Sequence, residues 1–228
     1  RLCAGSHDVG VGFNKMPGLD VYFTEDGCFA ASAQKRSSWY RLSGRFRTYY
    51  KLEEAVFGKH PNTTILLISG KEKALYENYY GTSGSRFHLL PPGIAPDSLT
   101  RPRISETKDV RRELAISTCQ RLVLTVGSAF YTKGVDRSIR ALASLPKKLR
   151  EQSFLLVVGE DNPKSYKRLA ARLGVPDQVH FCGGRHDVPR LLRAADLLLH
   201  PARQETAGMV LIEAMAAGLP VLVRSEER

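Results

Sequence analysis

The pattern of hydrophobic and polar residues is most regular in the second half of the chain. From Arg121 onward, short apolar runs typical of buried parallel strands alternate with longer amphipathic stretches of helical period. The predicted strands are Leu122–Val126, Phe154–Val158, Val179–Phe181, Leu197–Leu199 and Pro220–Val223. The predicted helices are about Val135–Leu149, Pro163–Leu173, Val188–Ala195 and Gly208–Ala217. This alternation predicts a Rossmann-like domain, in which a parallel sheet carries helices on both faces.

One segment of the first half mixes basic and aromatic residues. Residues 34–57 contain six Lys or Arg side chains interleaved with six aromatic ones. Apolar side chains recur in this segment at helical spacing, at Trp39, Leu42, Phe46, Tyr49 and Tyr50. We therefore predict an amphipathic basic-aromatic segment. Three uses remain open for it: lying on an anionic membrane surface, packing on a core with a solvated basic face, or stacking on nucleic acid.

Composition narrows the class of protein. With 228 residues, of which 43% are hydrophobic and 25% charged, the chain can bury a core as one large or two small domains. The formal net charge of +11 favours anionic partners, namely nucleotides, phosphorylated glycans, nucleic acid or acidic lipid. The sign of the charge does not choose among them.

The cysteines and the lengths of the apolar runs argue against a zinc site and a membrane-spanning helix. The four cysteines form no CxxC pair and no zinc-site spacing, so we expect reduced thiols and no metal site. The longest apolar runs fall far short of the ~20 residues of a membrane-spanning helix, and we expect no signal peptide. The expected location is cytosolic or peripheral to a membrane.

The loop Gly127–Gly134 carries candidate chemistry, because ligands of parallel α/β sheets bind beyond the carboxyl ends of the strands. It leads into a helix, so its backbone amides can receive phosphate oxygens, and Lys133 adds a positive charge. It matches neither the GxGxxG fingerprint nor the GxxxxGK[ST] loop, which counts against a dehydrogenase or an NTPase. The alternative is an ordinary turn with a solvated lysine.

The segment after Leu199 contains two glutamates. Glu205 falls in the strand-to-helix turn, and Glu213 lies more than one turn inside the following helix, so both carboxylates can face one cleft. Carboxylates accept hydrogen bonds from paired sugar hydroxyls, and Gly208 lets helix-start amides approach a diphosphate. The alternative is a pair of surface glutamates, although Glu213 lies among core-type residues, where an ionised carboxylate needs a partner.

Two further loops are less specific. In Gly183–Val188, Asp187 can cap the next helix and exposed amides can read a base edge, but capping alone explains the loop as well. Pro91–Ile94 stiffens a turn and reads as the start of a hinge between domains.

These motifs resemble the donor site of retaining glycosyltransferases with the GT-B fold. The loop that ends in Lys133-Gly134 and the Glu205-x7-Glu213 pair after His200-Pro201-Ala202 carry the resemblance. Four longer segments resemble the lipopolysaccharide core glucosyltransferases of Gram-negative bacteria, which add glucose to inner-core heptose: residues 12–23, 87–94, 133–146 and 194–223. The resemblance covers nearly the whole chain.

The resemblance implies an α/β protein of two Rossmann-like domains. Residues 1–92 would be the remainder of the N-terminal, acceptor-side domain, which includes the basic-aromatic segment 34–57. Residues 93–120 would be the hinge or linker, and residues 121–228 the C-terminal domain that binds the nucleotide sugar. We expect both ends to be incomplete: the family's first strands, with a glycine-rich loop, would precede Arg1, and further helices would follow Val223. Nucleotide binding is therefore a safer expectation for this chain than turnover.

The resemblance also implies roles for single residues. Glu205 would bind the hydroxyls of the donor sugar, Glu213 the ribose and Lys133 the diphosphate. The backbone would bind phosphate and sugar at Ala207, Gly208, Met209 and Val210. Arg185 would lie beside uracil, and Asp26 matches an acidic position that faces the acceptor. The implied catalytic residues are Glu205, Lys133 and Asp26.

Two positions depart from the family's pattern. Many relatives have an arginine where this chain has Thr132 and another where it has Ser98. Arg101 is a candidate substitute for the second. What replaces these arginines at the phosphate site stays open.

The implied reaction transfers glucose from UDP-glucose to the lipopolysaccharide core with retention of configuration, without a metal or a cofactor. The departing diphosphate would take the acceptor's proton, because the sequence identifies no carboxylate nucleophile. We expect the protein in the cytoplasm, bound peripherally to the inner face of the inner membrane, because an anionic membrane surface suits an enzyme whose acceptor is lipid-linked. No nucleic-acid partner is expected. The alternatives are a mannosyl- or galactosyltransferase, a sugar-nucleotide epimerase, or a non-catalytic membrane- or nucleic-acid-binding module. Donor sugar, acceptor and oligomeric state stay open.

Overall fold

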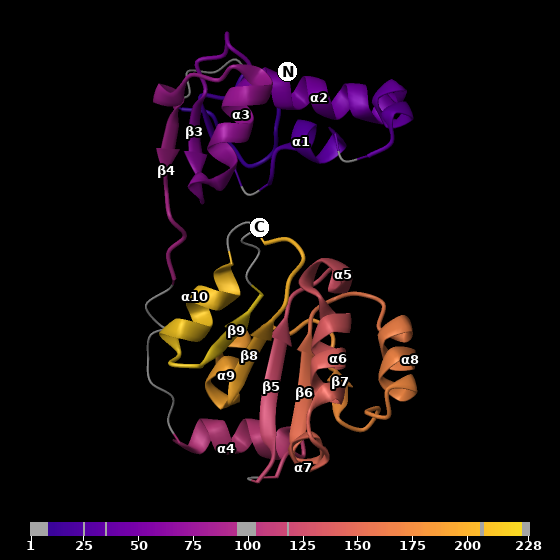
Figure 1. Cartoon of the computed structure of the whole chain (residues 1–228). Coiled ribbons are helices and arrows are strands. Elements are labelled where there is room, and N and C mark those ends of the chain that lie inside the picture. The colour runs from indigo at the N-terminus through magenta and orange to yellow at the C-terminus, as the bar shows by residue number, and fades with distance from the viewer. Residues whose placement is uncertain are drawn as a thin grey trace. The chain divides into compact units, whose positions relative to one another are not determined.

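The chain folds into two compact units, Arg1–Gly93 and Ile94–Arg228 (Figure 1). The computed structural model describes residues 9–24, 26–34, 36–94, 104–117, 119–205 and 208–224, with backbone only for 104–108. Each unit is built on its own parallel sheet with flanking helices. Apart from β1 and β2, strands that follow one another within each sheet are joined through helices. The second unit therefore has the α/β architecture that the pattern predicts, and the first has the one that the resemblance implies.

The sheet of the second unit has five parallel strands in the order β7-β6-β5-β8-β9. They are β5 (Arg121–Val126), β6 (Ser153–Val158), β7 (Val179–Phe181), β8 (Leu197–His200) and β9 (Val221–Val223). All the strands predicted for this half are confirmed, with bounds that shift by at most one residue. The order reverses at β5, because β6 and β7 extend the sheet on one side of it and β8 and β9 on the other.

The helices of the second unit are α4 (Ile104–Glu113), α5 (Phe130–Lys133), α6 (Val135–Ser144), α7 (Lys147–Glu151), α8 (Lys164–Arg172), α9 (Val188–Ala194) and α10 (Met209–Ala216). They follow the predicted alternation, except that one predicted helix is divided and that α4 and α5 were not predicted. The single helix predicted over residues 135–149 is wrong, since Leu145 is extended and separates α6 from α7. Pro146 is the physical reason: its ring pushes the preceding residue out of the helical region, and it has no amide hydrogen to donate.

Helix α4 lies within residues 93–120, the range predicted as a hinge or linker. The side chains of Val110 and Ile116 are buried in the core of the second unit, where α4 packs on α9. Arg111 also donates to the Asp196 carboxylate at 2.6 Å. The end of this range is therefore part of the second unit.

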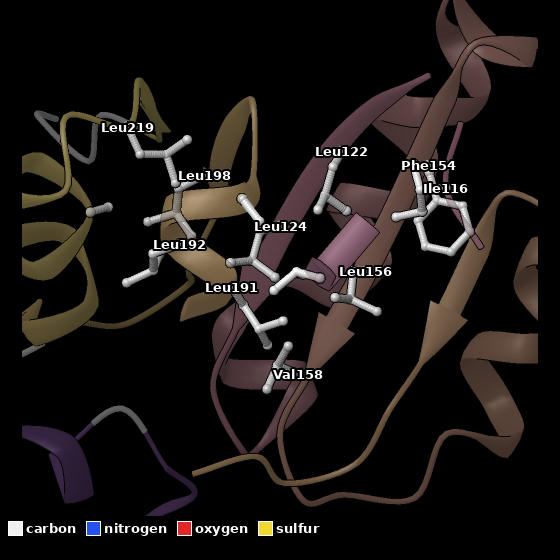
Figure 2. Packing of buried hydrophobic residues seen from close by; sticks show 13 residues of the cluster. Ile116, Leu122, Leu124, Phe154, Leu156, Val158, Leu191, Leu192, Leu198 and Leu219 are labelled. Carbon is white, nitrogen blue, oxygen red and sulfur yellow. The ribbon is translucent and has the colours of Figure 1, made fainter. Parts of the chain in front are cut away.

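Strand β6 shows why its sequence is an unbroken apolar run. All its residues are buried, and alternate side chains enter different cores: Leu156 and Val158 pack toward α9 and α10, whereas Leu155 and Val157 pack toward α6 and α8. Figure 2 shows the first of these clusters, where strand leucines meet Leu191 and Leu192 of α9. Burying one such side chain contributes about 1.5–3 kcal/mol.

The first unit has a four-stranded parallel sheet in the order β1-β2-β3-β4. Its strands are β1 (Val11–Gly12), β2 (Val21–Thr24), β3 (Thr64–Leu67) and β4 (Phe87–Leu89), and its α-helices are α1 (Phe29–Gln34), α2 (Gly44–Phe57) and α3 (Lys73–Tyr80). Short 3-10 turns are η1 (Ser38–Leu42), η2 (Gly70–Glu72) and η3 (Gly84–Arg86). The core is rich in aromatic residues, and Phe57 of α2 stacks on Tyr76 of α3 with ring centroids 3.7 Å apart.

The basic-aromatic segment is two elements rather than one helix. Ser43 adopts extended backbone between η1 and α2, and its hydroxyl caps α2 by accepting from the Phe46 amide at 3.1 Å. Aromatic residues on one side pack inward, as Tyr50 does against Tyr80. Trp39 and Leu42 stay 80% and 63% exposed. The segment therefore contributes to the core and also leaves an exposed apolar surface.

No helix among the residues that the structure describes is long and apolar enough to span a membrane.

A buried carboxylate, Glu53 of α2, organises the first unit. It is fully buried and accepts from the amides of Phe29 and Ala30 at 2.9 and 3.0 Å, which start α1. Lys15 donates to it at 2.6 Å and the Tyr80 hydroxyl at 2.5 Å. Burial, followed by the bond to this carboxylate, raises the pKa of Tyr80 well above its usual range. These four donors, with the Cys28 thiol as a weaker fifth at 3.9 Å, compensate the cost of removing a charged group from water.

We predict that Glu53→Ala destabilises the first unit by about 3–5 kcal/mol, because Lys15 and two helix-start amides lose their shared acceptor. Glu54→Ala is the matched control, since Glu54 is the exposed neighbour on the same helix; it should change stability by no more than about 0.5 kcal/mol. The rate at which a thiol reagent labels Cys28, 1% exposed beside Glu53, reports opening of this unit. Equal labelling rates in the two variants would contradict the assignment.

Candidate functional site

The candidate site of the second unit lies where the strand order reverses. Strands β5 and β8 are paired neighbours, yet their chain connections leave in opposite directions across the sheet. In open parallel sheets this is where a crevice forms beyond the carboxyl ends of the strands. The loops that follow the two strands begin at Gly127 and Pro201, and they carry the predicted Lys133 and Glu205.

The structure brings Lys133 and Glu205 into direct contact. The Lys133 Nζ atom donates to Glu205 Oε2 at 2.7 Å, and the two side chains are 24% and 26% exposed. The residues are 72 positions apart in sequence. A cation and an anion that meet at this edge of the sheet, open to solvent but partly shielded from it, are available to a ligand that carries both phosphate and hydroxyl groups.

Three groups hold the Glu205 carboxylate. His200 at the end of β8 approaches Oε2 through Nε2 at 2.8 Å, and the Gly208 amide donates to Oε1 at 3.1 Å. The His200 hydrogen bond, together with Lys133 and the Gly208 amide, lowers the pKa of Glu205 to about 2 against the opposing effect of burial. The carboxylate is therefore ionised at neutral pH.

A close backbone approach places Lys133. Gly134 adopts φ +72° between α5 and α6, and a Cβ at this position would overlap the Pro201 carbonyl oxygen. Only glycine combines this left-handed backbone with such proximity. The Thr132 carbonyl accepts the Arg203 amide at 2.7 Å, which ties the same two loops together.

Arg203 strengthens this link with its side chain. Its guanidinium donates to both carboxylate oxygens of Asp136 at 2.7 and 2.8 Å and to the Tyr131 carbonyl at 2.7 Å. This pairing lowers the pKa of Asp136 below its usual range. Arg203, Asp136 and His200 were not among the residues predicted to be functional. The available signals were the charges of Arg203 and Asp136 near the two loops and the place of His200 directly before the loop that carries Glu205.

Part of the predicted phosphate loop is already occupied. The Phe130 amide donates to Asp161 at 2.7 Å, and the Gly127 amide donates to the Val158 carbonyl at 2.8 Å. These two amides are used by the protein itself, so the loop offers fewer phosphate donors than its position predicts. Lys133 lies in the last turn of the short α5 and not in a free loop.

Glu213 occupies the second turn of α10, with a half-buried side chain. Among the described residues no side chain or amide donates to its carboxylate, and burial raises its pKa. Gly208, with φ +63°, starts this helix, followed by Met209 and Val210. An ionisable group that is partly desolvated and unpaired gains the most from a ligand that brings hydrogen-bond donors.

Arg185 is already engaged in ion pairs. Its guanidinium donates to Asp187 at 2.7 and 2.8 Å and to Glu113 of α4 at 2.9 Å, and Arg190 joins the same carboxylates. Arg185 lowers the pKa of Asp187 to about 2. The predicted side-chain cap by Asp187 is wrong, because its carboxylate bonds to Arg185 and makes no capping hydrogen bond. The cluster fixes the plane of the Arg185 guanidinium.

Asp26 belongs to the first unit and is exposed. Its backbone carbonyl accepts from the Tyr76 hydroxyl at 3.1 Å and the Thr24 hydroxyl at 3.0 Å. The Gly27 carbonyl is held by Lys15, itself paired with Glu53. The buried network thus fixes the backbone that carries Asp26.

Ala207, Ser98 and Arg101 lie outside the described residues.

The two α/β units, each built on a sheet of parallel strands, have the architecture of GT-B glycosyltransferases. The chain belongs to the glycosyl transferases group 1 family, whose model matches residues 106–227.

Comparisons with individual proteins agree. The chain is 50% identical over 214 residues to the lipopolysaccharide glucosyltransferase WaaG of Escherichia coli strain K12, covering 93% of this chain and 57% of that protein. A crystal structure of WaaG, a glycosyltransferase involved in lipopolysaccharide biosynthesis, superposes with a TM-score of 0.90 at 48% identity, over 96% of this chain and 60% of that one. A crystal structure of Anabaena Alr3699/HepE in complex with UDP-glucose shares the fold, with a TM-score of 0.71 at 23% identity over 89% of this chain and 52% of that one. The chain therefore spans about three fifths of the length of WaaG.

We predict that Gly134→Ala disrupts the candidate site, because the added methyl group must displace the Pro201 backbone and with it the loop that carries Glu205. Gly174→Ala is the matched control: Gly174 has φ +71° but no atom within 4 Å of a Cβ. Both variants pay the left-handed backbone cost of about 1–2 kcal/mol, and Gly134→Ala should lose about 1–3 kcal/mol more from overpacking. Urea unfolding measures the difference, and equal losses would show that the loop contact is unimportant.

Proposed function

We propose that this chain is the larger part of a retaining glycosyltransferase that transfers glucose from UDP-glucose to inner-core heptose of lipopolysaccharide. The observation that carries the proposal is the Lys133–Glu205 pair at the strand-order reversal, together with Glu213 of α10, which has no hydrogen-bond partner among the described residues. The name and the 50% identity of the Escherichia coli relative support the choice of donor and acceptor.

The proposed donor site uses charges that are already in place. Lys133 exchanges Glu205 for the diphosphate, whose greater charge is the better partner. Glu205 then accepts hydrogen bonds from sugar hydroxyls, and Glu213 accepts those of the ribose. The backbone amides of Ala207, Met209 and Val210 bind the phosphates, while the Gly208 amide stays on Glu205. Arg185, fixed by Asp187 and Glu113, lies beside uracil.

The proposed chemistry stabilises the leaving group. As the bond to glucose breaks, negative charge develops on the diphosphate, where Lys133 and helix-start amides face it. The acceptor hydroxyl attacks from the same side and gives its proton to the departing phosphate, with Asp26 on the acceptor side. Because these groups supply the positive charge, the proposed reaction uses neither a metal nor a cofactor.

We predict that UDP and UDP-glucose stabilise the full-length protein by about 2.7 kcal/mol at a ligand concentration of 100 Kd, measured as a rise in Tm. Glu213→Gln should weaken binding of UDP and of UDP-glucose about 10- to 100-fold, because it removes hydrogen bonds to a charged acceptor. Without ligand this variant should be at least as stable as the wild type, because it removes a desolvated charge. Loss of binding is thereby separated from loss of folding.

Glu151→Gln is the control, because Glu151 ends α7 at the opposite, amino-terminal edge of the sheet. It should leave the Tm shift unchanged. An absent shift in the wild type would refute the proposed function. A screen of UDP-glucose, UDP-galactose and GDP-mannose separates the glucosyltransferase from the alternative transferases.

We propose further that the protein acts in the cytoplasm and rests on the anionic inner face of the inner membrane through its basic-aromatic segment. Trp39, Leu42 and Tyr49 are 80%, 63% and 48% exposed. The cations beside them are exposed too, and Arg45 lies 5.7 Å from the Tyr49 ring centroid. Such a surface binds a membrane when its aromatic rings lie at the depth of the headgroups and its cations contact anionic lipids. Each well-placed cation contributes about 1 kcal/mol.

We predict co-sedimentation of the full-length protein with phosphatidylglycerol vesicles but not with phosphatidylcholine vesicles, and loss of the complex at high salt. The double variant Trp39→Ala/Leu42→Ala should weaken vesicle binding about 10-fold or more, because it removes apolar area from the bilayer interface. Leu149→Ala, at a 52% exposed leucine of the second unit, is the control and should bind like the wild type. Binding to single-stranded RNA in place of vesicles would contradict the membrane assignment.

A further inference from the structure

His200 is the most enclosed polar residue of the candidate site. It ends β8, where the backbone pairs with Val223 of β9, and it is only 2% exposed. Its Nε2 lies 2.8 Å from Glu205 Oε2. Its other ring nitrogen, Nδ1, is buried and has no hydrogen-bond partner among the described residues. The ring therefore makes a single side-chain hydrogen bond there, and that bond is directed at Glu205.

The chemistry of the carboxylate decides the direction of this bond. An ionised carboxylate has no hydrogen to donate, so the hydrogen between the two groups is carried by His200 Nε2. A buried ring is held by its packing and cannot follow a moving partner. Glu205 therefore has one rigid donor on Oε2, His200, and one mobile donor on the same oxygen, Lys133, at 2.7 Å.

These two donors respond differently when a nucleotide arrives. Lys133 is a long flexible cation that a diphosphate can attract away from Glu205. Once it leaves, Glu205 keeps only His200 on Oε2 and the Gly208 amide on Oε1. Without His200 the carboxylate would be free to follow the lysine or to turn into solvent.

We propose that His200 is a positioning residue, which holds the Glu205 carboxylate toward the donor sugar while Lys133 transfers to the diphosphate. The inference rests on the proposed function and adds a residue to which that function assigns no role. It implies that His200 contributes mainly to binding of the sugar part of the donor, because among the described residues its ring hydrogen-bonds Glu205 and neither Lys133 nor Glu213.

Isothermal titration of the full-length protein with UDP and with UDP-glucose tests this. His200→Leu keeps the apolar bulk but removes the donor; it should bind UDP within about 2-fold of wild type and UDP-glucose about 10-fold or more weakly, the worth of one hydrogen bond to a charged acceptor. His200→Gln restores an N–H at the reach of Nε2 and should recover most of the affinity for UDP-glucose. Rescue by glutamine is a result that a merely structural role would not produce.

The outcomes separate the two proposals. If the wild type binds neither ligand, the proposed function fails. If it binds both and His200→Leu binds UDP-glucose as well as the wild type does, or loses UDP and UDP-glucose equally, the positioning role is overturned. Should His200→Leu not fold, His200→Asn takes its place, because its shorter amide stops short of Glu205. Equal affinity of the asparagine and glutamine variants for UDP-glucose would then overturn the inference.

Discussion

The close approach of Gly134 to the Pro201 carbonyl is the constraint on which the candidate site depends. It brings the loop after β5 against the loop after β8, and the Arg203 bonds to Asp136 and Tyr131 lock that arrangement. Lys133 and Glu205 then meet at 2.7 Å although neither element alone would place them together. The pair lies where the strand order reverses, the position at which an open parallel sheet leaves room for a ligand.

Both units pair a glutamate with a lysine at the start of a helix, but with different exposure. Glu53 is fully enclosed, accepts two amides at the start of α1 and holds Lys15, whose side chain is 13% exposed. Glu205 accepts the amide of Gly208 ahead of α10, and its side chain is 26% exposed. The buried pair has no access to a competing ligand and can only stabilise the fold. The exposed pair can exchange partners, as the proposed donor binding requires.

Glu213 differs from the two paired glutamates, because no described residue donates a hydrogen bond to its carboxylate. Burial raises its pKa, and no described group compensates the charge. A carboxylate in this state costs the free protein stability and gains it back when a ligand supplies donors. Glu205, Lys133 and Arg185, in contrast, are paired with groups of the protein itself, so the proposed nucleotide ligand would have to replace existing bonds there. Its affinity would then depend on the difference in free energy between the bonds broken and the bonds formed.

The sequence by itself determined the second sheet, because fully buried parallel strands require continuous apolar runs and their helices an apolar stripe, and both are local patterns. It also indicated Lys133, Glu205 and Glu213, since charged residues after strands are visible in one dimension. It did not predict the breaks at Ser43 and Pro146, where a single residue outweighs the periodicity. Only the tertiary structure decided that Arg185 is held by Glu113, that His200 hydrogen-bonds Glu205 and that Glu213 has no partner among the described residues. These contacts join segments that are brought together only by the packing of the fold. The pattern of residues along the sequence does not predict which charged groups will pair.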